Sequence, residues 1–296
     1  MTNDPRFTLV GLRPAAPAPA VRRRMRPRDW PLLPMLLLGL IVLGCLGCEF
    51  IMTKDPGYMD LMHYSAAPCR EFPFGTDSLG RDIFSMIWYG GRVSLSIGFL
   101  STLISTAAAV LFGTVSGLAP KWLDALLMRA AEIVLSVPNL LLVILLQAIL
   151  GPASALSIAL VIGLTGWMGI AKVVRTEVLR LRGSEYVIAA RMMGGGFLHV
   201  LWKHLAPNFV SSIMFMVVMN VRSAIIAEST LSFMGIGLPL EVISWGSMLS
   251  LAERALMSRA WWALLIPGAF LVTTLMCITS LGNHLRKRLD HDQRKL

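Results

Sequence analysis

The sequence predicts an all-α integral membrane protein with six transmembrane helices and a water-facing segment of two short helices. Three observations predict this fold class. Of the 296 residues, 55% are hydrophobic and only 15% are charged, whereas soluble domains carry about 25% charged residues. Six apolar runs each approach the roughly 20 residues that a membrane-crossing helix needs. A long polar segment, residues 173–208, separates the fourth run from the fifth.

Residues 1–30 form a Pro/Ala-rich basic tail that offers too little apolar surface to fold, so we expect it to be disordered and cytoplasmic. Its arginines act either as a topological anchor or as a contact for anionic lipid headgroups. The run 31–52 resembles a signal peptide in its basic start. Because it is longer than a signal core of 7–15 residues and further spans follow, we predict a retained first transmembrane helix.

Residues 53–90 are polar and rich in proline and glycine, and we predict an extracytoplasmic loop. Asp77 follows Gly75 and Thr76, a pattern typical of a capped turn, and Arg81 and Asp82 can bond backbone groups nearby. A catalytic acid pair is the alternative, but no histidine or further carboxylate repeats the spacing. We therefore expect a structural turn at the membrane border.

The remaining chain holds five spans, expected within residues 91–284, followed by a basic cytoplasmic tail, 285–296. The spans cover about 93–117, 125–149, 154–172, 209–230 and 261–282. Trp261 and Trp262 mark a membrane interface, as aromatic belts do.

The polar segment 173–208 contains two short helices in Glu185–Asn208. Good helix formers up to Met192 are interrupted by Gly194–Gly196, an apolar stripe resumes at Phe197, and Pro207 ends it. Two short helices joined by a glycine turn suit docking into a groove of another protein.

Orientation follows from the basic residues. The segments 1–30, 118–129, 172–208 and 283–296 hold 20 of the 27 Lys and Arg residues. Because positive charge accumulates on the cytoplasmic side, both termini and the polar segment are predicted to be cytoplasmic.

Motifs for catalysis are missing from the sequence. No P-loop pattern G-x4-G-K-[ST] occurs, so the chain must borrow an ATPase if ATP drives it. His199 and His204 are five residues apart, which is not a metal-binding pair on one helix face, and no metal or other cofactor is predicted. Of the four cysteines, Cys45, Cys48 and Cys277 lie in apolar runs and only Cys69 is expected to be exposed, so no disulfide framework follows.

Charged residues within spans are the better clues, because they are costly in lipid. Arg222 and Glu228 lie six residues apart on one helix and should not pair directly. Each is a candidate for the transport pathway or for a contact with a partner subunit, and a structural role is the alternative for Glu228. Arg129 and Glu132 are expected to pair near a helix start.

Three blocks of the chain resemble permease subunits of ABC importers, in the dipeptide/oligopeptide/nickel branch. The cytoplasmic motif E-A-A-x3-G-x9-I-x-L-P is matched at Ala189, Ala190, Gly194 and Pro207, but Ile188, His204 and Ala206 replace the first Glu, the Ile and the Leu. The other two blocks are G-T-D-x2-G-R-D at Gly75, Thr76, Asp77, Gly80, Arg81 and Asp82, and A-E-x2-L-S-F with W-G at Ala227–Gly237, Trp245 and Gly246. The likeness runs from about residue 73 to 288.

The resemblance implies a permease of a bacterial cytoplasmic (inner) membrane importer for peptides, nickel or a metal–chelator complex. It implies a second homologous permease, two cytoplasmic ATP-binding subunits and an extracytoplasmic substrate-binding protein as partners. The segment 173–208 would be the coupling loop, with Ile188, Ala189, Ala190, Gly194 and Pro207 at the ATPase, and the remaining motif residues would be structural. We add the hypothesis that Glu185, one turn before Ile188, supplies the missing charge. A stand-alone channel or secondary transporter and a membrane-bound enzyme are the alternatives.

Overall fold

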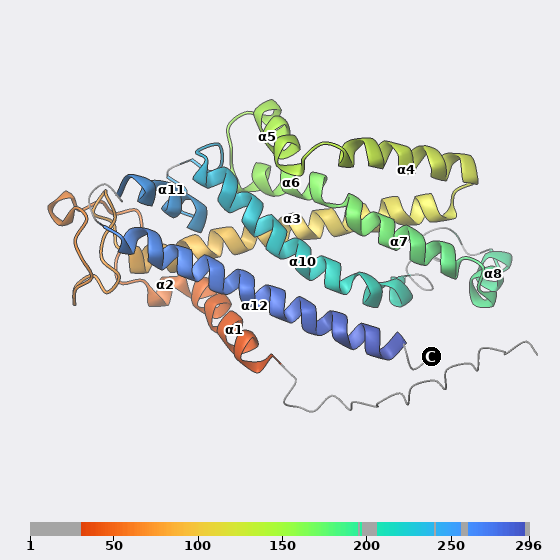
Figure 1. Ribbon diagram of the computed structural model, residues 1–296, viewed down its shortest axis with the longest axis horizontal. Coiled ribbons are helices and arrows are strands. Elements are labelled where there is room, and N and C mark those ends of the chain that lie inside the picture. The colour runs from red at the N-terminus through yellow and green to blue at the C-terminus, as the bar shows by residue number, and fades with distance from the viewer. Residues whose placement is uncertain (1–30, 195, 197–205, 240, 256–259, 294–296) are drawn as a thin grey trace, which may run out of the picture. The chain divides into compact units, whose positions relative to one another are not determined.

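The computed structural model describes residues 31–194, 196, 206–239, 241–255 and 260–293, and these residues fold into helices (Figure 1). The elements are α1 (Leu32–Leu46), α2 (Cys48–Ile51), η3 (Leu61–His63), α3 (Ile83–Leu118), α4 (Lys121–Leu135), α5 (Asn139–Leu150), α6 (Ala155–Gly166), α7 (Met168–Leu181), α8 (Glu185–Met192), α10 (Ala206–Phe233), α11 (Trp245–Ala255) and α12 (Trp262–Gln293). The all-α prediction is confirmed for this part of the chain.

Three helices are long and apolar enough to cross a membrane by themselves: α3, the Ser212–Phe233 part of α10 and the Trp262–Arg288 part of α12. Two pairs qualify only when each pair is counted as one span, α4 with α5 and α6 with α7. The apolar helix α1, with 15 residues, is shorter than these. The structure therefore supports three to five spans, and the count of six stays a prediction.

Two predicted spans are bent rather than straight. The helix expected at 125–149 is interrupted at residues 136–138, where α4 and α5 meet at 89°. Pro138 explains this break, because proline lacks the backbone N–H and disfavours helical backbone in the residue before it. The span expected at 154–172 bends by 45° at Trp167 and continues to Leu181 as α7.

Several helices extend past the segments predicted for the spans. α3 begins at Ile83, inside the loop predicted at 53–90, because Asp82 caps its first turn by accepting hydrogen bonds from the N–H groups of Phe84 and Ser85. The segment predicted as the coupling loop, 173–208, begins inside α7 and ends inside α10. The tail predicted at 285–296 starts inside α12, which continues to Gln293.

α3 is the central helix, and it packs against α6, α7, α10 and α1. Its contact with α7 depends on Gly113 and Gly117, which present bare backbone one helical turn apart. A Cβ atom on Gly113 would lie 2.6 Å from the carbonyl oxygen of Ala171, and one on Gly117 would lie 2.7 Å from Val178 Cγ1. This spacing of small residues is the one that lets membrane helices approach closely.

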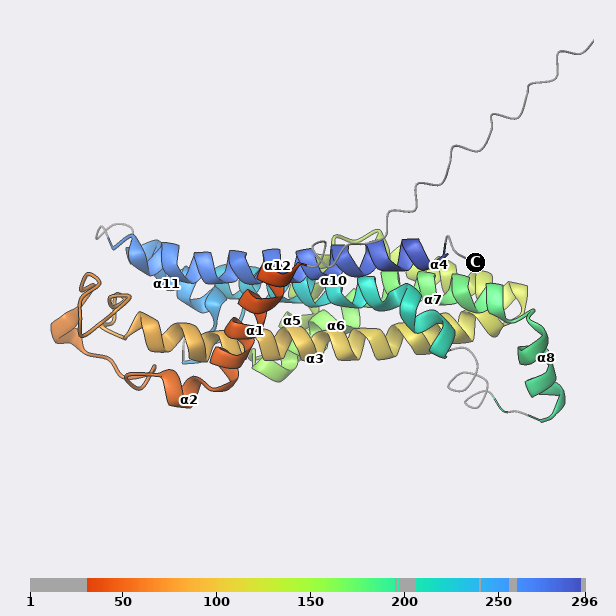
Figure 2. The same ribbon diagram turned by 90° about the horizontal axis from the view of Figure 1, so that it is seen from below.

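Figure 2 shows α8 beyond the end of α7, at the end of the helical bundle opposite the loop that precedes α3. The two sequence blocks before α3 and around α8 therefore lie at opposite ends of α3.

Candidate functional site

The turn that precedes α3 is organised around Asp77. Its Oδ1 accepts hydrogen bonds from the backbone N–H groups of Leu79 and Arg81, each at 2.9 Å. Its Oδ2 pairs with the Arg81 guanidinium at 2.7 Å, and both side chains are buried. Gly80 has φ +73°, and a Cβ there would overlap the Asp60 carbonyl oxygen. The predicted capped turn is confirmed, and Asp77 and Arg81 hold it together from inside.

Asp82 connects this turn to the chain that follows α2. Its Oδ2 accepts hydrogen bonds from the hydroxyls of Ser85 at 2.6 Å and Thr53 at 2.8 Å. The indole of Trp262, at the start of α12, donates to the Thr76 carbonyl at 3.2 Å. The turn thus fastens the beginnings of α3 and α12 to each other.

Glu228 of α10 is fully buried and is held by serine hydroxyls. Ser94 of α3 donates to Oε2 at 3.0 Å, and Ser232 donates to Oε1 at 3.0 Å. Ser94 also accepts the backbone N–H of Trp245 at 3.2 Å, so one hydroxyl links three helices. We call Glu228, Ser94, Ser229, Ser232 and Trp245 the signature node.

Two glycines without side chains allow the residues of the signature node to pack closely. A Cβ on Gly246 would lie 2.6 Å from Ser229 Cα, and one on Gly91 would lie 2.6 Å from the Trp245 indole. The Trp245 indole is fully buried and donates to the Ile87 carbonyl at 3.0 Å. The structure therefore brings Gly91–Ser94, Ala227–Gly237 and Trp245–Gly246 together, although 151 residues separate Ser94 from Trp245.

A cross-helix ion pair that sequence reasoning missed joins α4 to α7. Arg175 binds Asp124 with two parallel hydrogen bonds of 2.5 Å, and Ser116 at the end of α3 donates to the same carboxylate. Arg182 donates to the Gly117 carbonyl at 3.0 Å. These contacts lock α7 onto the end of α3 just before α8 begins. Because 51 residues separate the pair, no local sequence pattern indicates it.

α8 follows α7 after a tight turn at Ser184, whose carbonyl accepts the N–H groups of Val187 and Ile188. Val187 is fully buried against residues of α3, α7 and α10. Glu185, Ile188 and Met192 are exposed and lie at the i, i+3 and i+7 positions of the opposite face. Among the described side chains of α8, Val187 thus attaches the helix to the bundle, and an acid and two apolar residues face outward.

Gly194 follows α8 with φ +83°, a conformation that residues with side chains rarely adopt. A glycine just after the end of a helix often takes this conformation. The backbone of Ala189 and Ala190 lies in α8, and that of Pro207 lies in the first turn of α10. The second short helix predicted from Phe197, with His199 and His204, lies outside the described residues.

Arg222 lies partly buried on α10, and its Nη1 donates weakly to the Thr279 hydroxyl of α12 at 3.4 Å. Its Nε is buried, and nothing in the described chain accepts a hydrogen bond from it. As expected, it does not pair with Glu228. Arg129 pairs with Glu132 at 3.2 Å, but in the second half of α4 rather than at a helix start. All four cysteines are free, and Cys69 is the exposed one.

Taken together, the apolar helices and the buried contacts that join them define a multi-pass helical membrane protein. Residues 109–291 match the family described as binding-protein-dependent transport system inner membrane component. The chain belongs to this family, and it is a transmembrane transport component rather than an enzyme.

Two curated relatives span most of the chain. The dipeptide transport system permease protein DppC of Bacillus subtilis (strain 168) is 35% identical over 260 residues, 88% of this chain and 81% of the relative. The oligopeptide transport system permease protein OppC of the same organism is 34% identical over 272 residues, 92% of this chain and 88% of the relative. The predicted family is confirmed, and with it a binding protein and an ATP-hydrolysing partner in general terms.

A solved structure shows the same fold. The chain matches an inward-facing structure of the MetNI methionine ABC transporter with a TM-score of 0.55 and 14% identity, covering 69% of this chain and 96% of that chain. Interrupted helices are also typical of secondary transporters, and two bent helix pairs occur here. Family membership sets aside that alternative and the membrane-bound enzyme.

Proposed function

We propose that this chain is a six-span permease subunit of an ATP-driven peptide importer, and that it forms the pathway together with a second homologous permease. Its similarity over about nine-tenths of its length to permeases named for dipeptide and oligopeptide transport carries this proposal. Those names favour peptides over the alternative cargo of nickel or a metal–chelate complex. Arg222 is then a candidate for the pathway or for the partner permease.

The proposal is tested by reconstitution. Proteoliposomes that hold both permeases and two ATPase subunits should accumulate a labelled dipeptide when the binding protein and ATP are supplied, and not when the second permease is omitted. A non-hydrolysable ATP analogue serves as the control. Accumulation without ATPase subunits would contradict the proposal. Uptake of a nickel chelate in place of peptide would show that the substrate is a metal chelate instead.

The six spans of the proposal are α1 continued by α2, then α3, α4 with α5, α6 with α7, α10 and α12. The loop before α3 and the helix α8 lie at opposite ends of α3. Together with the excess of Lys and Arg in the segments near α8, this arrangement favours a cytoplasmic α8 and cytoplasmic termini.

Cysteine labelling checks this orientation. In a Cys69→Ser background, which removes the exposed native thiol, cysteines at Ser65 and Glu241 should react with an impermeant reagent added outside. Cysteines at Ser184 and Lys295 should react only after the inner face is opened. Labelling of the Ser184 position from outside would contradict the orientation and the role of α8 together.

For coupling, α8 is proposed to be the part of the coupling loop that contacts an ATPase subunit. Glu185 supplies the charge and Ile188 the apolar contact, on the exposed face described above. Movement of α8 passes to α7 through the short turn at Ser184, and from α7 to α3 and α4 through the Arg175–Asp124 pair and the glycine contact. Because these helices are joined rigidly, closure of the ATPases would change the side to which the cavity opens.

A further inference from the structure

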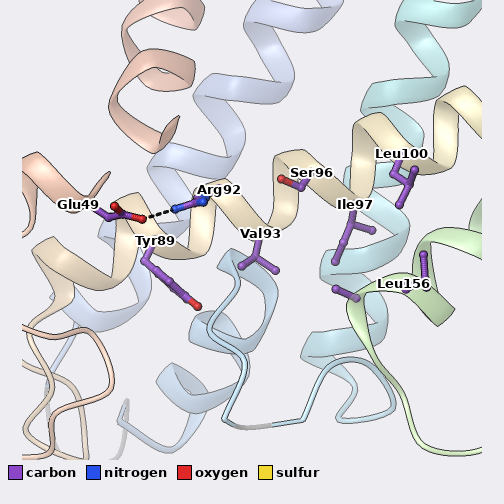
Figure 3. Close-up of a pocket in the computed structure, with 9 residues that line it drawn as sticks. Glu49, Tyr89, Arg92, Val93, Ser96, Ile97, Leu100 and Leu156 are labelled. Carbon is purple, nitrogen blue, oxygen red and sulfur yellow. Dashed lines mark hydrogen bonds and ion pairs between the residues drawn. The ribbon is translucent and has the colours of Figure 1, made fainter. Parts of the chain in front are cut away.

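A pocket of about 580 Å³ runs along α3 near the end that carries the signature node. Figure 3 shows Glu49 of α2 and Arg92 of α3 at one end of the pocket, with Leu100 and Leu156 at the other. From Tyr89 to Leu100, the lining residues cover about 16 Å of helix axis. This volume lies within the range of roughly 300–1,000 Å³ that small-ligand sites occupy.

The charged end of the pocket has unused bonding capacity. Arg92 Nη1 donates to Glu49 Oε1 at 3.0 Å and lies 3.7 Å from Cys48 Sγ. Among the described residues, nothing bonds to Arg92 Nε and Nη2 or to Glu49 Oε2. The side chains are 44% and 70% exposed. Charged groups on a spanning helix are costly against lipid, so this face meets water, a ligand or protein.

The rest of the pocket is largely apolar. Val93, Ile97 and Leu100 line it from α3, and Leu156 faces them from the start of α6 (Figure 3). A second pocket of about 560 Å³ shares Glu49 and Tyr89 with it and adds Lys54, Asp55 and Glu241 from the predicted extracytoplasmic side. A charged entrance therefore leads to an apolar wall, which suits a ligand with two opposite charges and apolar side chains.

We propose that Glu49 and Arg92 bind the two charged termini of a peptide as it enters the pathway. This inference rests on the proposed function and names the side chains that would read the cargo. Arg92 can offer a carboxylate a planar fork of donors, and Glu49 can accept the N-terminal ammonium group. Their mutual ion pair opens as the two peptide contacts form, so no charge is left unpaired. The apolar wall from Val93 to Leu100 receives a peptide side chain without selecting one.

The first test compares uptake of three peptides by the reconstituted complex: a free dipeptide, its N-acetylated form and its C-terminal amide. Each is first shown to load the binding protein. Arg92→Gln should lower uptake of the free and N-acetylated peptides roughly tenfold, the effect of one lost charge-assisted contact, and leave the amide unchanged. Glu49→Gln should lower uptake of the free peptide and the amide, and spare the N-acetylated one. Arg129→Gln, which breaks an exposed ion pair on α4, should change none of the three.

Equal losses for all three peptides would mean that the pair is merely structural, and wild-type behaviour of both variants would also overturn the inference. If the wild-type complex takes up no peptide, the proposed function fails instead. A second measurement does not depend on the derivatives: a photo-crosslinking residue replacing Ser96 should form an adduct with labelled peptide, and one replacing Leu126 on α4 should not. An adduct of the Ser96 position with the second permease alone would assign the pocket to the subunit interface and overturn the inference.

Discussion

Replacing Gly194 by valine is expected to lower peptide uptake by the assembled transporter roughly 5- to 150-fold while leaving the chain inserted in the membrane. Gly194 has φ +83°, and among the described residues a Cβ there would meet nothing within 4 Å. The cost of the substitution against this part of the chain is therefore backbone strain, about 1 to 3 kcal/mol for a residue held in this region. The strain is relieved if the backbone rotates, which redirects the chain that leaves α8. A loss of about 1 to 3 kcal/mol of coupling free energy corresponds to the roughly 5- to 150-fold loss of uptake.

A matched pair of variants isolates the backbone effect. Gly194→Asn adds a side chain of similar bulk, but asparagine tolerates positive φ better than valine does, so it should retain most of the uptake. Membrane content of both variants, measured by immunoblot, should equal wild type because Val187 anchors α8 upstream. Equal uptake by the two variants would show that the conformation of Gly194 does not matter.

The second large effect is expected at the signature node. Glu228→Ala should remove most of the assembled permease from the membrane, because the hydroxyls of Ser94, Ser229 and Ser232 then lose their buried acceptor. An unsatisfied buried polar group costs about 1 to 3 kcal/mol, and the cavity left by the side chain adds to this. Glu228→Gln keeps the shape and one acceptor oxygen, so it should restore most of the protein.

Purification of the complex with its partners distinguishes this structural role from a role in the pathway. The structural role requires the yield of assembled complex to fall in Glu228→Ala and to recover in Glu228→Gln. If Glu228→Ala instead assembles at the wild-type yield and only its transport changes, the carboxylate acts in the pathway and the burial argument is wrong.

Local patterns predicted much of this protein well. The apolar runs predicted the three to five candidate spans that the structure supports, because the length and hydropathy of a span are properties of a continuous stretch. The Asp77 turn and the end of the first short helix before Gly194 were predicted for the same reason, since each depends on residues a few positions apart. The bend at Pro138 could have been predicted too, because the proline lies inside the apolar run expected at 125–149.

The interhelical contacts could not be predicted. Nothing in the sequence indicates that Ser94 bonds to Glu228 or that Arg175 pairs with Asp124, because packing joins residues that the chain separates by 134 and 51 positions. The contact of Gly113 and Gly117 with α7 could not be predicted either, because a small residue in an apolar run does not show which helix it faces. The charged end of the pocket also depends on packing, which places Glu49 of α2 beside Arg92 of α3.

We propose that the coupling loop, with α8 and Gly194, transmits ATPase movement to the spans. Substrate-stimulated ATP hydrolysis by purified complexes that carry Gly194→Val tests this role, because hydrolysis can be measured without requiring transport. We expect the variant complex to contain all its subunits and to hydrolyse ATP at a rate that the loaded binding protein no longer stimulates. A wild-type stimulation in that complex would contradict the claim that this loop is the transmission element.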